Sequence, residues 1–162
     1  MTTELPSRRR ILASGAALLG LSALPASARN ADNQMLVIKD PDCGCCGAWI
    51  DIVEAAGFTV TIELAAGTAL MRYKASNGIP EAMASCHTAR IGGYVLEGHV
   101  PVADIRRLLE DRPDAIGLAV PGMPYGSPGM GLESEREAYD VLLIRKDGTS
   151  EVFTRYPAAP LS

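Results

Sequence analysis

The spacing of apolar residues predicts a strand-helix-strand-helix unit in the first half of the chain. The apolar run 35–39 ends at an Asp-Pro-Asp turn, as expected of a buried strand. Apolar residues then recur at helical spacing, and Gly57 stands where a helix C-terminal glycine belongs, so a helix is predicted to begin at the cysteine-rich segment 43–46. Its recurring residues are Trp49, Ile52, Val53 and Ala56. Residues 58–64 predict a second strand, and 68–76 a second helix.

The second half of the chain predicts two hairpins separated by a helix and a long loop. The runs 82–91 and 94–97 flank Gly92-Gly93, which is typical of an antiparallel hairpin. A helix is expected from Pro101 to Arg112, with Val102, Ile105, Leu108 and Leu109 on one face. Residues 117–132 hold five Gly and three Pro, so they are predicted to form a loop without helix or central strand. Residues 139–145 and 150–156 predict a closing hairpin.

The N-terminal segment 1–28 has the composition of an export signal. Ser7-Arg8-Arg9-Arg10 is a charged region, residues 11–24 form an apolar run too short to cross a bilayer as a helix, and Ala26-Ser27-Ala28 suits a signal peptidase. The order Ser-Arg-Arg-x-Ile-Leu favours the twin-arginine type, which exports folded proteins, over an ordinary secretory signal. The predicted mature domain is 29–162, outside the cytoplasm and without stable membrane insertion after cleavage.

Composition and charge indicate one globular domain and exclude several partners. The chain has 162 residues, 48% hydrophobic and 21% charged, with a formal net charge of −4. Removal of the signal takes away three arginines and one glutamate, which leaves 134 residues at −6. Basic residues form no run outside the signal, so no nucleic acid partner is expected.

Four cysteines remain after removal of the signal, and two interpretations compete for them. An even count in an exported chain suggests disulfides, and Cys43 to Cys46 with Cys45 to Cys86 is one possible pairing. Three cysteines in four residues are crowded for a disulfide framework, however. At a helix N-terminus, the dipole and free N–H groups favour thiolates, which bind soft metals. The preferred prediction is a metal site formed by Cys43, Cys45, Cys46 and Cys86.

Copper fits this cysteine pattern better than zinc does. A tetrahedral zinc site normally uses paired CxxC knuckles, whereas Cys45 and Cys46 are adjacent and suit different ions. Cu(I) accepts two or three thiolates and allows one sulfur to bridge two metals.

Further donors are considered with an alternative for each. His87 would point away from Cys86 on a strand, and His99 could cap the next helix with its ring in solvent. A Pro-Gly-Met triplet occurs twice and carries Met123 and Met130, whose thioethers are soft ligands or else apolar anchors that close the loop over the core. All four residues are secondary candidates for the metal site, and the loop could act as a lid.

Five motifs together resemble a known family. The residues are Asp40-Pro41-x-Cys43-Gly44-Cys45-Cys46-x-x-Trp49, Ser85-Cys86-His87-Thr88-Ala89, Gly92-Gly93-Tyr94, Glu97-Gly98-His99-Val100-Pro101 and Pro121-Gly122-Met123-Pro124-x-Gly126-Ser127-Pro128-Gly129-Met130. They resemble the CopG-type copper-resistance proteins of bacteria over residues 35–156, apart from Gly131, where the family commonly has Glu. The resemblance implies a thioredoxin-like fold, a periplasmic location, and copper held by the CxCC cysteines and Cys86, as a multinuclear thiolate cluster.

The predicted element order leads to the same fold class. We expect an α/β, thioredoxin-like fold (βαβα-ββα core) with a Gly/Pro/Met-rich loop and a C-terminal β-hairpin. Pro80 is the cis-proline candidate, and its loop would bring Cys86 towards the helix-borne cysteines.

Three functions remain open at this point. The first is an exported protein that sequesters Cu(I) or passes it to other periplasmic copper-handling proteins. The second is a thiol or copper oxidoreductase that cycles Cys43 and Cys46 between dithiol and disulfide. The third is a structural zinc or disulfide domain whose methionine loop binds a partner protein. No catalytic residue is assigned.

Overall fold

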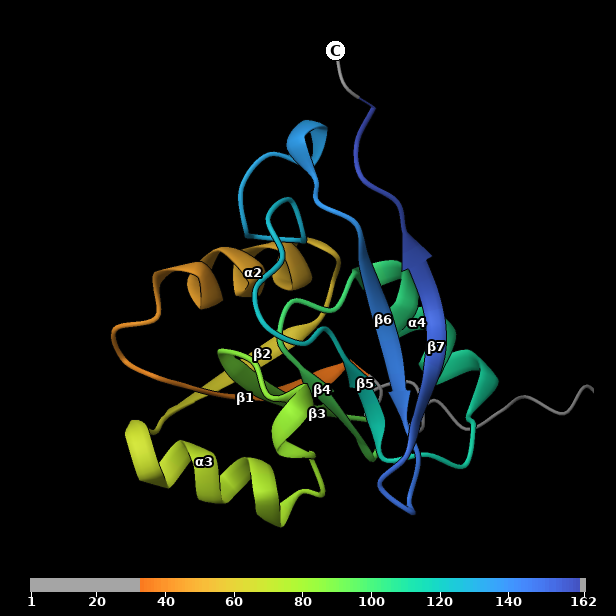
Figure 1. Ribbon diagram of the computed structural model, residues 1–162. Helices are drawn as coiled ribbons and strands as arrows, with labels where there is room; N and C mark the ends of the chain where they lie inside the picture. Colours follow the sequence, from red (N-terminus) through yellow and green to blue (C-terminus); the bar gives the residue numbers. More distant parts are fainter. Residues whose placement is uncertain (1–32, 161–162) are drawn as a thin grey trace, which may run out of the picture.

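The structure is a computed structural model that describes residues 33–160, so the predicted signal segment 1–28 lies outside the described residues. Described strands are β1 (Gln34–Lys39), β2 (Thr59–Leu64), β3 (His87–Ile91), β4 (Tyr94–Glu97), β5 (Gly117–Ala119), β6 (Tyr139–Ile144) and β7 (Ser150–Tyr156). The helices are α2 (Gly44–Ala55), α3 (Gly67–Ser76) and α4 (Val102–Asp111), with short 3-10 helices at Glu81–Met83 and Glu133–Glu135 (Figure 1). This mixed α/β architecture confirms the predicted order of the core elements and the closing hairpin.

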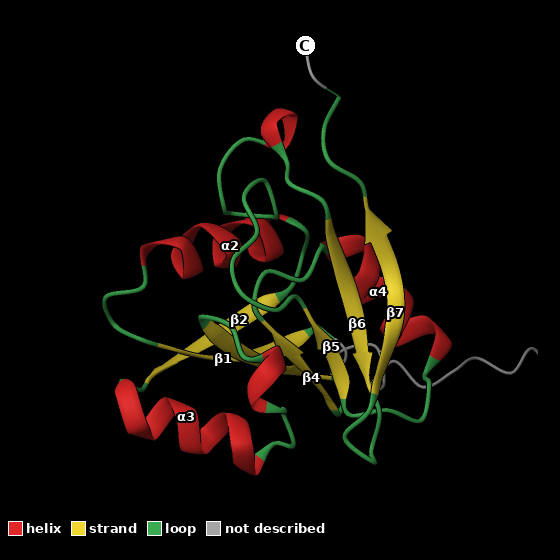
Figure 2. Ribbon diagram, viewed as in Figure 1, coloured by secondary structure: helices red, strands yellow, loops and turns green. Residues whose placement is uncertain are grey.

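All seven strands belong to one mixed sheet in the order β2-β1-β3-β4-β5-β6-β7. β1 pairs with β2 in parallel and with β3 antiparallel, and β4 pairs antiparallel with β3 and parallel with β5. Helices α2 and α3 lie on opposite sides of the β1–β2 end of the sheet (Figures 1 and 2). Because β1 lies between β2 and β3, the segment that follows it begins α2 over an interior strand of the sheet.

Helix α2 forms because its apolar residues face the core at helical spacing. Trp49 and Val53 are fully buried, and Trp49 Nε1–H donates to the Val100 carbonyl at 2.9 Å. The chain leaves the helix through Gly57, whose φ of 96° is the left-handed conformation predicted for a C-terminal glycine. Ile52, predicted on the same apolar face, is 39% exposed. The tryptophan therefore ties α2 to the segment that precedes α4, close to the cysteines.

The prediction that residues 117–132 contain no strand is wrong for the first three of them. Gly117–Ala119 form β5, a fully interior strand between β4 and β6. A Cβ on Gly117 would lie 1.7 Å from the Val95 carbonyl oxygen, so the glycine is what lets β5 approach β4 closely. The remainder of the segment is the predicted loop.

Two details around Pro80 also differ from expectation. All described peptide bonds are trans, so Pro80 is not a cis-proline; it stands in extended conformation before the 3-10 helix Glu81–Met83. The predicted strand 82–91 begins only at His87, because residues 81–83 turn into that short helix. Cys86 consequently precedes the strand. Among the described residues no helix has the length and apolar character needed to cross a membrane.

Candidate metal centre

Three cysteines occupy the N-terminal turn of α2, as predicted. Cys43 is the residue that precedes the helix, and Cys45 and Cys46 lie in its first turn, where no acidic side chain is present. Cys46 is fully buried, whereas Cys43 and Cys45 are partly exposed. The turn offers sulfur atoms beside free backbone N–H groups, a setting that stabilises thiolates.

The sulfur atoms of all four cysteines lie together. Cys43 and Cys46 form a disulfide, Cys45 and Cys86 are free, and the Cys43 and Cys45 sulfurs are 3.5 Å apart. All four sulfur atoms lie within 4.8 Å of one another. Half of the alternative disulfide pairing is therefore present, because Cys43–Cys46 is formed and Cys45–Cys86 is not. On reduction, the same four atoms could surround soft metal ions.

The two histidines join Cys86 in a second group of donors. Cys86 Sγ lies 3.3 Å from His87 Nδ1 and 3.0 Å from His99 Nε2. The expectation that His87 points away from Cys86 is wrong, because strand alternation does not extend to Cys86, which lies before β3. Sγ of Cys86 thus belongs both to the four-sulfur group and to a Cys-His-His group within 4.8 Å.

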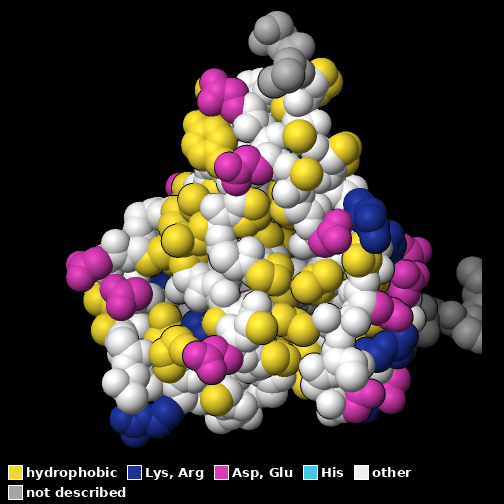
Figure 3. All heavy atoms as spheres, in the orientation of Figure 1, with side chains coloured by type: hydrophobic (Ala, Val, Ile, Leu, Met, Phe, Trp, Pro, Cys, Tyr) yellow, Lys and Arg dark blue, Asp and Glu magenta, His cyan; other side chains and the backbone are white. Residues whose placement is uncertain are grey.

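Both imidazole rings are fully buried, and no histidine reaches the molecular face in Figure 3. The solvent-exposed capping role considered for His99 is therefore wrong. His99 Nδ1 lies 2.7 Å from the Pro128 carbonyl, which can only accept, so Nδ1 carries the proton and Nε2 presents a lone pair towards Cys86. The His87 ring packs against Trp49 with centroids 4.4 Å apart, and its buried Nε2 has no hydrogen-bond partner.

Burial sets the protonation states of these groups. It lowers the pKa of His87 well below its usual value, with His99 and Lys74 acting in the same direction. Burial also lowers the pKa of His99, although the hydrogen bond to Pro128 opposes this. Burial raises the pKa of the Cys86 thiol to about 12, and the nearby Cys45 raises it too. Both imidazoles are therefore neutral donors, and a metal must displace the Cys86 proton.

Metal-free protein with the disulfide intact should lose stability as pH falls below about 6.5, the ordinary pKa of histidine. His87 and His99 stay neutral in the fold but take up protons in the unfolded chain, so the unfolded state binds more protons below this pH. Each histidine that stays neutral in the fold should lower the free energy of unfolding by at most ~1.4 kcal/mol per pH unit there. Urea unfolding at pH 7.5, 6.5 and 5.5 measures the effect.

His87→Leu/His99→Gln is the matched control for this pH dependence. Leucine replaces the ring beside Trp49, whose Nε2 has no hydrogen-bond partner, and glutamine can still donate to the Pro128 carbonyl. Burial raises the pKa of Glu97, which opposes the histidine effect as pH falls, but Glu97 is present in both proteins. Equal pH dependence of the two proteins would contradict the assignment.

The Gly/Pro/Met-rich loop contacts both parts of the site, namely the segment around Cys86 and the helix α2 that carries the other three cysteines. At its start Gly122 pairs with Ser85 in an isolated parallel bridge, beside Cys86. Further along, a Cβ on Gly129 would lie 2.7 Å from the Trp49 backbone nitrogen, so this part of the loop lies on α2. Met123 is 53% exposed and is not an apolar anchor, whereas Met130 is partly buried. The loop therefore runs from the Cys86 segment to α2. Metal ligation by the thioether of Met123 or Met130 stays a prediction.

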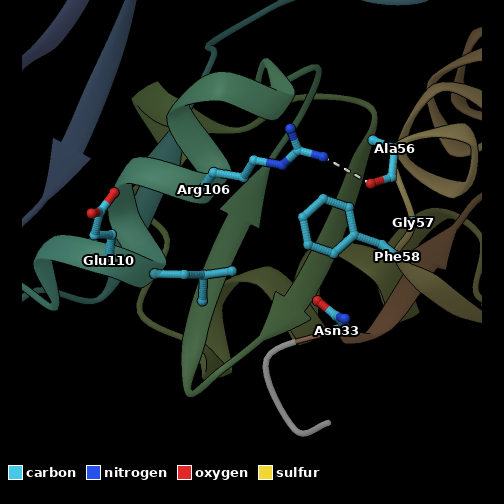
Figure 4. A pocket seen from close by; sticks show the side chains of 7 residues that line it. Asn33, Ala56, Gly57, Phe58, Arg106 and Glu110 are labelled. Atoms are coloured by element: carbon cyan, nitrogen blue, oxygen red, sulfur yellow. Dashed lines mark hydrogen bonds between the residues drawn. The ribbon is translucent and has the colours of Figure 1, made fainter. Parts of the chain in front are cut away.

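A separate cavity lies away from the metal centre, and no cysteine or histidine lines it. It has a volume of about 500 Å³ between the end of α2 and α4, where Arg106 donates to the Ala56 carbonyl at 2.9 Å beside Phe58 (Figure 4). Its lining contains no cysteine or histidine. The thiol chemistry of the described chain is therefore separate from this cavity.

The sequence did not predict the residues that fix the position of the Cys86 segment. Glu97 accepts a hydrogen bond from the Ser85 backbone N–H at 2.6 Å and pairs with Lys74 Nζ at 2.6 Å. The available signal was a carboxylate at the end of a strand, β4, whose residues are all buried. Pro128, whose carbonyl orients His99, carried no such signal.

Comparisons with known proteins identify the family of this chain. A family model described as "Protein of unknown function, DUF411" matches residues 83–130, which include Cys86, both histidines and both triplets. Two solved structures described as "Copper resistance protein copG", Form 1 and Form 2, match with TM-scores of 0.72 and 0.71, each at 44% sequence identity. The matches cover 77% and 76% of this chain and 98% of each solved chain. Among curated protein sequences, none matches. With this identity over nearly the whole length of those structures, the chain belongs to the CopG family of copper-resistance proteins.

Proposed function

We propose that the protein binds Cu(I) through Cys43, Cys45, Cys46 and Cys86, as a multinuclear thiolate cluster. The observation that carries the proposal is the approach of four sulfur atoms, from two distant parts of the chain, to within 4.8 Å of one another. Soft Cu(I) prefers thiolates and allows one sulfur to bridge two ions, which suits sulfurs as close as the 3.5 Å between Cys43 and Cys45. Copper resistance of the matched proteins supports copper over zinc.

The histidines complete the proposed ligand set on the Cys86 side. Neutral imidazole nitrogen is a common copper ligand, and His99 presents Nε2 to the place where Cys86 Sγ lies. His87 offers Nδ1 to the same sulfur atom. We propose these two as further ligands, with Met123 and Met130 as candidates from the loop.

The export of this domain is part of the proposal. Residues 1–28 are proposed to be a twin-arginine signal, so that the mature domain works in the periplasm. A thioredoxin-like relationship is supported by the strand order β2-β1-β3-β4 and by the CxxC at the start of α2, although Pro80 lacks the cis bond. Exported copper binding in copper resistance is the function that these observations favour.

Elemental analysis of the exported protein tests this function. Protein from copper-grown cells, purified without oxygen under reducing conditions, is expected to carry more than one copper per chain and to absorb in the ultraviolet through thiolate-to-copper charge transfer. Zinc-grown cells provide the control for metal preference. Protein with four free thiols that takes up no Cu(I), or that binds only zinc, would contradict the proposal.

A redox role is the second candidate, and the disulfide favours it. Cys43 and Cys46 are joined while Cys45 and Cys86 are free, so one pair of the cluster is oxidised and the other is not. Reduction of this disulfide consumes two electrons and two protons: a partner dithiol would supply both as it becomes a disulfide, whereas two Cu(I) ions oxidised to Cu(II) would supply the electrons and water the protons. A potential of the Cys43–Cys46 pair well below about −300 mV, typical of structural disulfides, would argue against cycling.

A further inference from the structure

A buried ion pair lies next to the segment that carries Cys86 of the metal centre. Lys74 on α3 is 3% exposed and Glu97 at the end of β4 is fully buried, and the two side chains are 2.6 Å apart. Thr88 closes the group: it accepts from Lys74 Nζ at 3.0 Å and donates to Glu97 Oε2 at 2.7 Å. A buried pair is weak evidence for stability, because desolvation offsets its attraction. Its location suggests another role.

The Glu97 carboxylate holds the Cys86-His87 dipeptide at both ends. Oε1 accepts the backbone N–H of Ser85, directly before Cys86, at 2.6 Å, and Oε2 accepts the hydroxyl of Thr88, directly after His87. One buried side chain therefore contacts the residue on each side of these two donor residues. Displacement of the carboxylate would release the Ser85 N–H, whereas Thr88 would still be held in β3 by its pairing with β1 and β4.

Two other segments of the site, one containing Gly98 and one containing Gly122, also contact the Ser85–His87 segment. Gly98, between Glu97 and His99, donates to the His87 carbonyl at 3.0 Å, and a Cβ here would lie 2.5 Å from Ser85 Oγ. The hydroxyl of Ser85 donates to the carbonyl of Gly122, in the first Pro-Gly-Met triplet. The placement of Ser85 is thus coupled to the His99 segment and to the loop.

We propose that Glu97, oriented by Thr88, is a positioning residue of the metal centre, which fixes Cys86 Sγ opposite the cysteines of α2 through the Ser85 backbone, while Lys74 balances its charge. This inference rests on the proposed function. Lys74 anchors one carboxylate oxygen from α3, and Thr88 anchors the other, so that Glu97 has one orientation. Polar groups that orient metal ligands typically change metal affinity about 10- to 100-fold when they are removed.

Two double variants separate positioning from charge. Lys74→Met/Glu97→Gln removes the ion pair but keeps an amide oxygen for the Ser85 N–H, while Thr88 can accept from the new amide nitrogen. Lys74→Met/Glu97→Leu has a similar size and leaves both partners without the hydrogen bond. Arg145→Met/Glu151→Gln neutralises an exposed ion pair of the β6–β7 hairpin and is the matched control.

Two readouts are measured on reduced protein: Cu(I) affinity by chelator competition, and the alkylation rate of Cys86 relative to Cys45 in the metal-free state by mass spectrometry. The glutamine and control variants should stay within about 3-fold of the unmodified protein in both. The leucine variant should bind Cu(I) about 10- to 100-fold more weakly, with a clearly changed Cys86-to-Cys45 ratio at temperatures where it is folded.

The proposal is overturned if the leucine variant changes only the unfolding temperature and leaves both readouts as in the unmodified protein. If that variant does not fold, Thr88→Val serves instead, since it removes the hydroxyl that orients Glu97 without removing a charge. The same two changes are then expected, and their absence would count against the inference. A protein that takes up no Cu(I) at all would end the proposed function, while the alkylation ratio would still decide the positioning role.

Discussion

Cys86→Ser should reduce the Cu(I) content of the reduced protein by half or more, and weaken its binding by more than about 100-fold, beyond what the loss of an orienting residue costs. The Cys86 sulfur is the one atom shared by the four-cysteine group and the Cys-His-His group. A serine hydroxyl stays protonated and is a hard donor, so it cannot take the place of a thiolate towards Cu(I). Copper per chain by elemental analysis and chelator competition measure the loss.

Ser150→Ala, an exposed change at the start of β7, is the control for the Cys86 variant. It removes a hydroxyl far along the chain from the donors and is expected to leave copper content unchanged. The near-ultraviolet copper absorption should fall in parallel with copper content in Cys86→Ser. Unaltered copper content and absorption in that variant would show that the metal is held by the α2 cysteines alone.

Oxidation to the Cys43–Cys46 disulfide should lower the Cu(I) capacity to no more than one ion per chain, against more than one for the reduced protein. In the disulfide form two of the four sulfurs are bonded to each other and only Cys45 and Cys86 remain as thiols. Two thiols can hold one Cu(I) in linear geometry but cannot bridge several ions. Cu(I) titration against a chromophoric chelator, before and after reduction, measures the difference.

Thiol counts and a matched variant complete that experiment. When counted after denaturation, the oxidised protein should show two thiols and the reduced protein four, and reductant should restore the copper capacity. Cys43→Ser/Cys46→Ser has the oxidised number of thiols permanently, so its capacity should be low and should not respond to reductant. Equal capacities of the oxidised and reduced unmodified protein would contradict a cluster that uses all four sulfurs.

The helices and the other six strands follow from local pattern, whereas β5 does not. Trp49 and Val53 at helical spacing predict α2, and the glycine after it marks the end. Gly117 begins a segment with the Gly and Pro content of a loop. Only its contact with the Val95 carbonyl on β4 explains why it belongs to an interior strand. That contact joins residues far apart in sequence, so no local pattern contains it.

The same limit explains which site residues could be predicted. The α2 cysteines are neighbours in sequence, and their crowding predicts chemistry directly. Opposite directions for Cys86 and His87 follow from the sequence only if both belong to the predicted strand 82–91; β3 begins at His87, so alternation does not relate the two side chains. His99 depends on the carbonyl of Pro128, and Cys86 on the carboxylate of Glu97, and both contacts are long-range.

The distance along the chain between the donors links metal loading to folding. Cys43 to Cys46 are close to one another even in an unfolded chain, but Cys86 reaches them only when β1 and β3 pair and α2 packs over them. A ligand that needs all four sulfurs binds the folded state almost exclusively, and its binding energy adds to the free energy of unfolding by mass action. Copper would then act on this domain as a reversible cross-link, so copper-loaded chains should outlast metal-free chains under proteolysis.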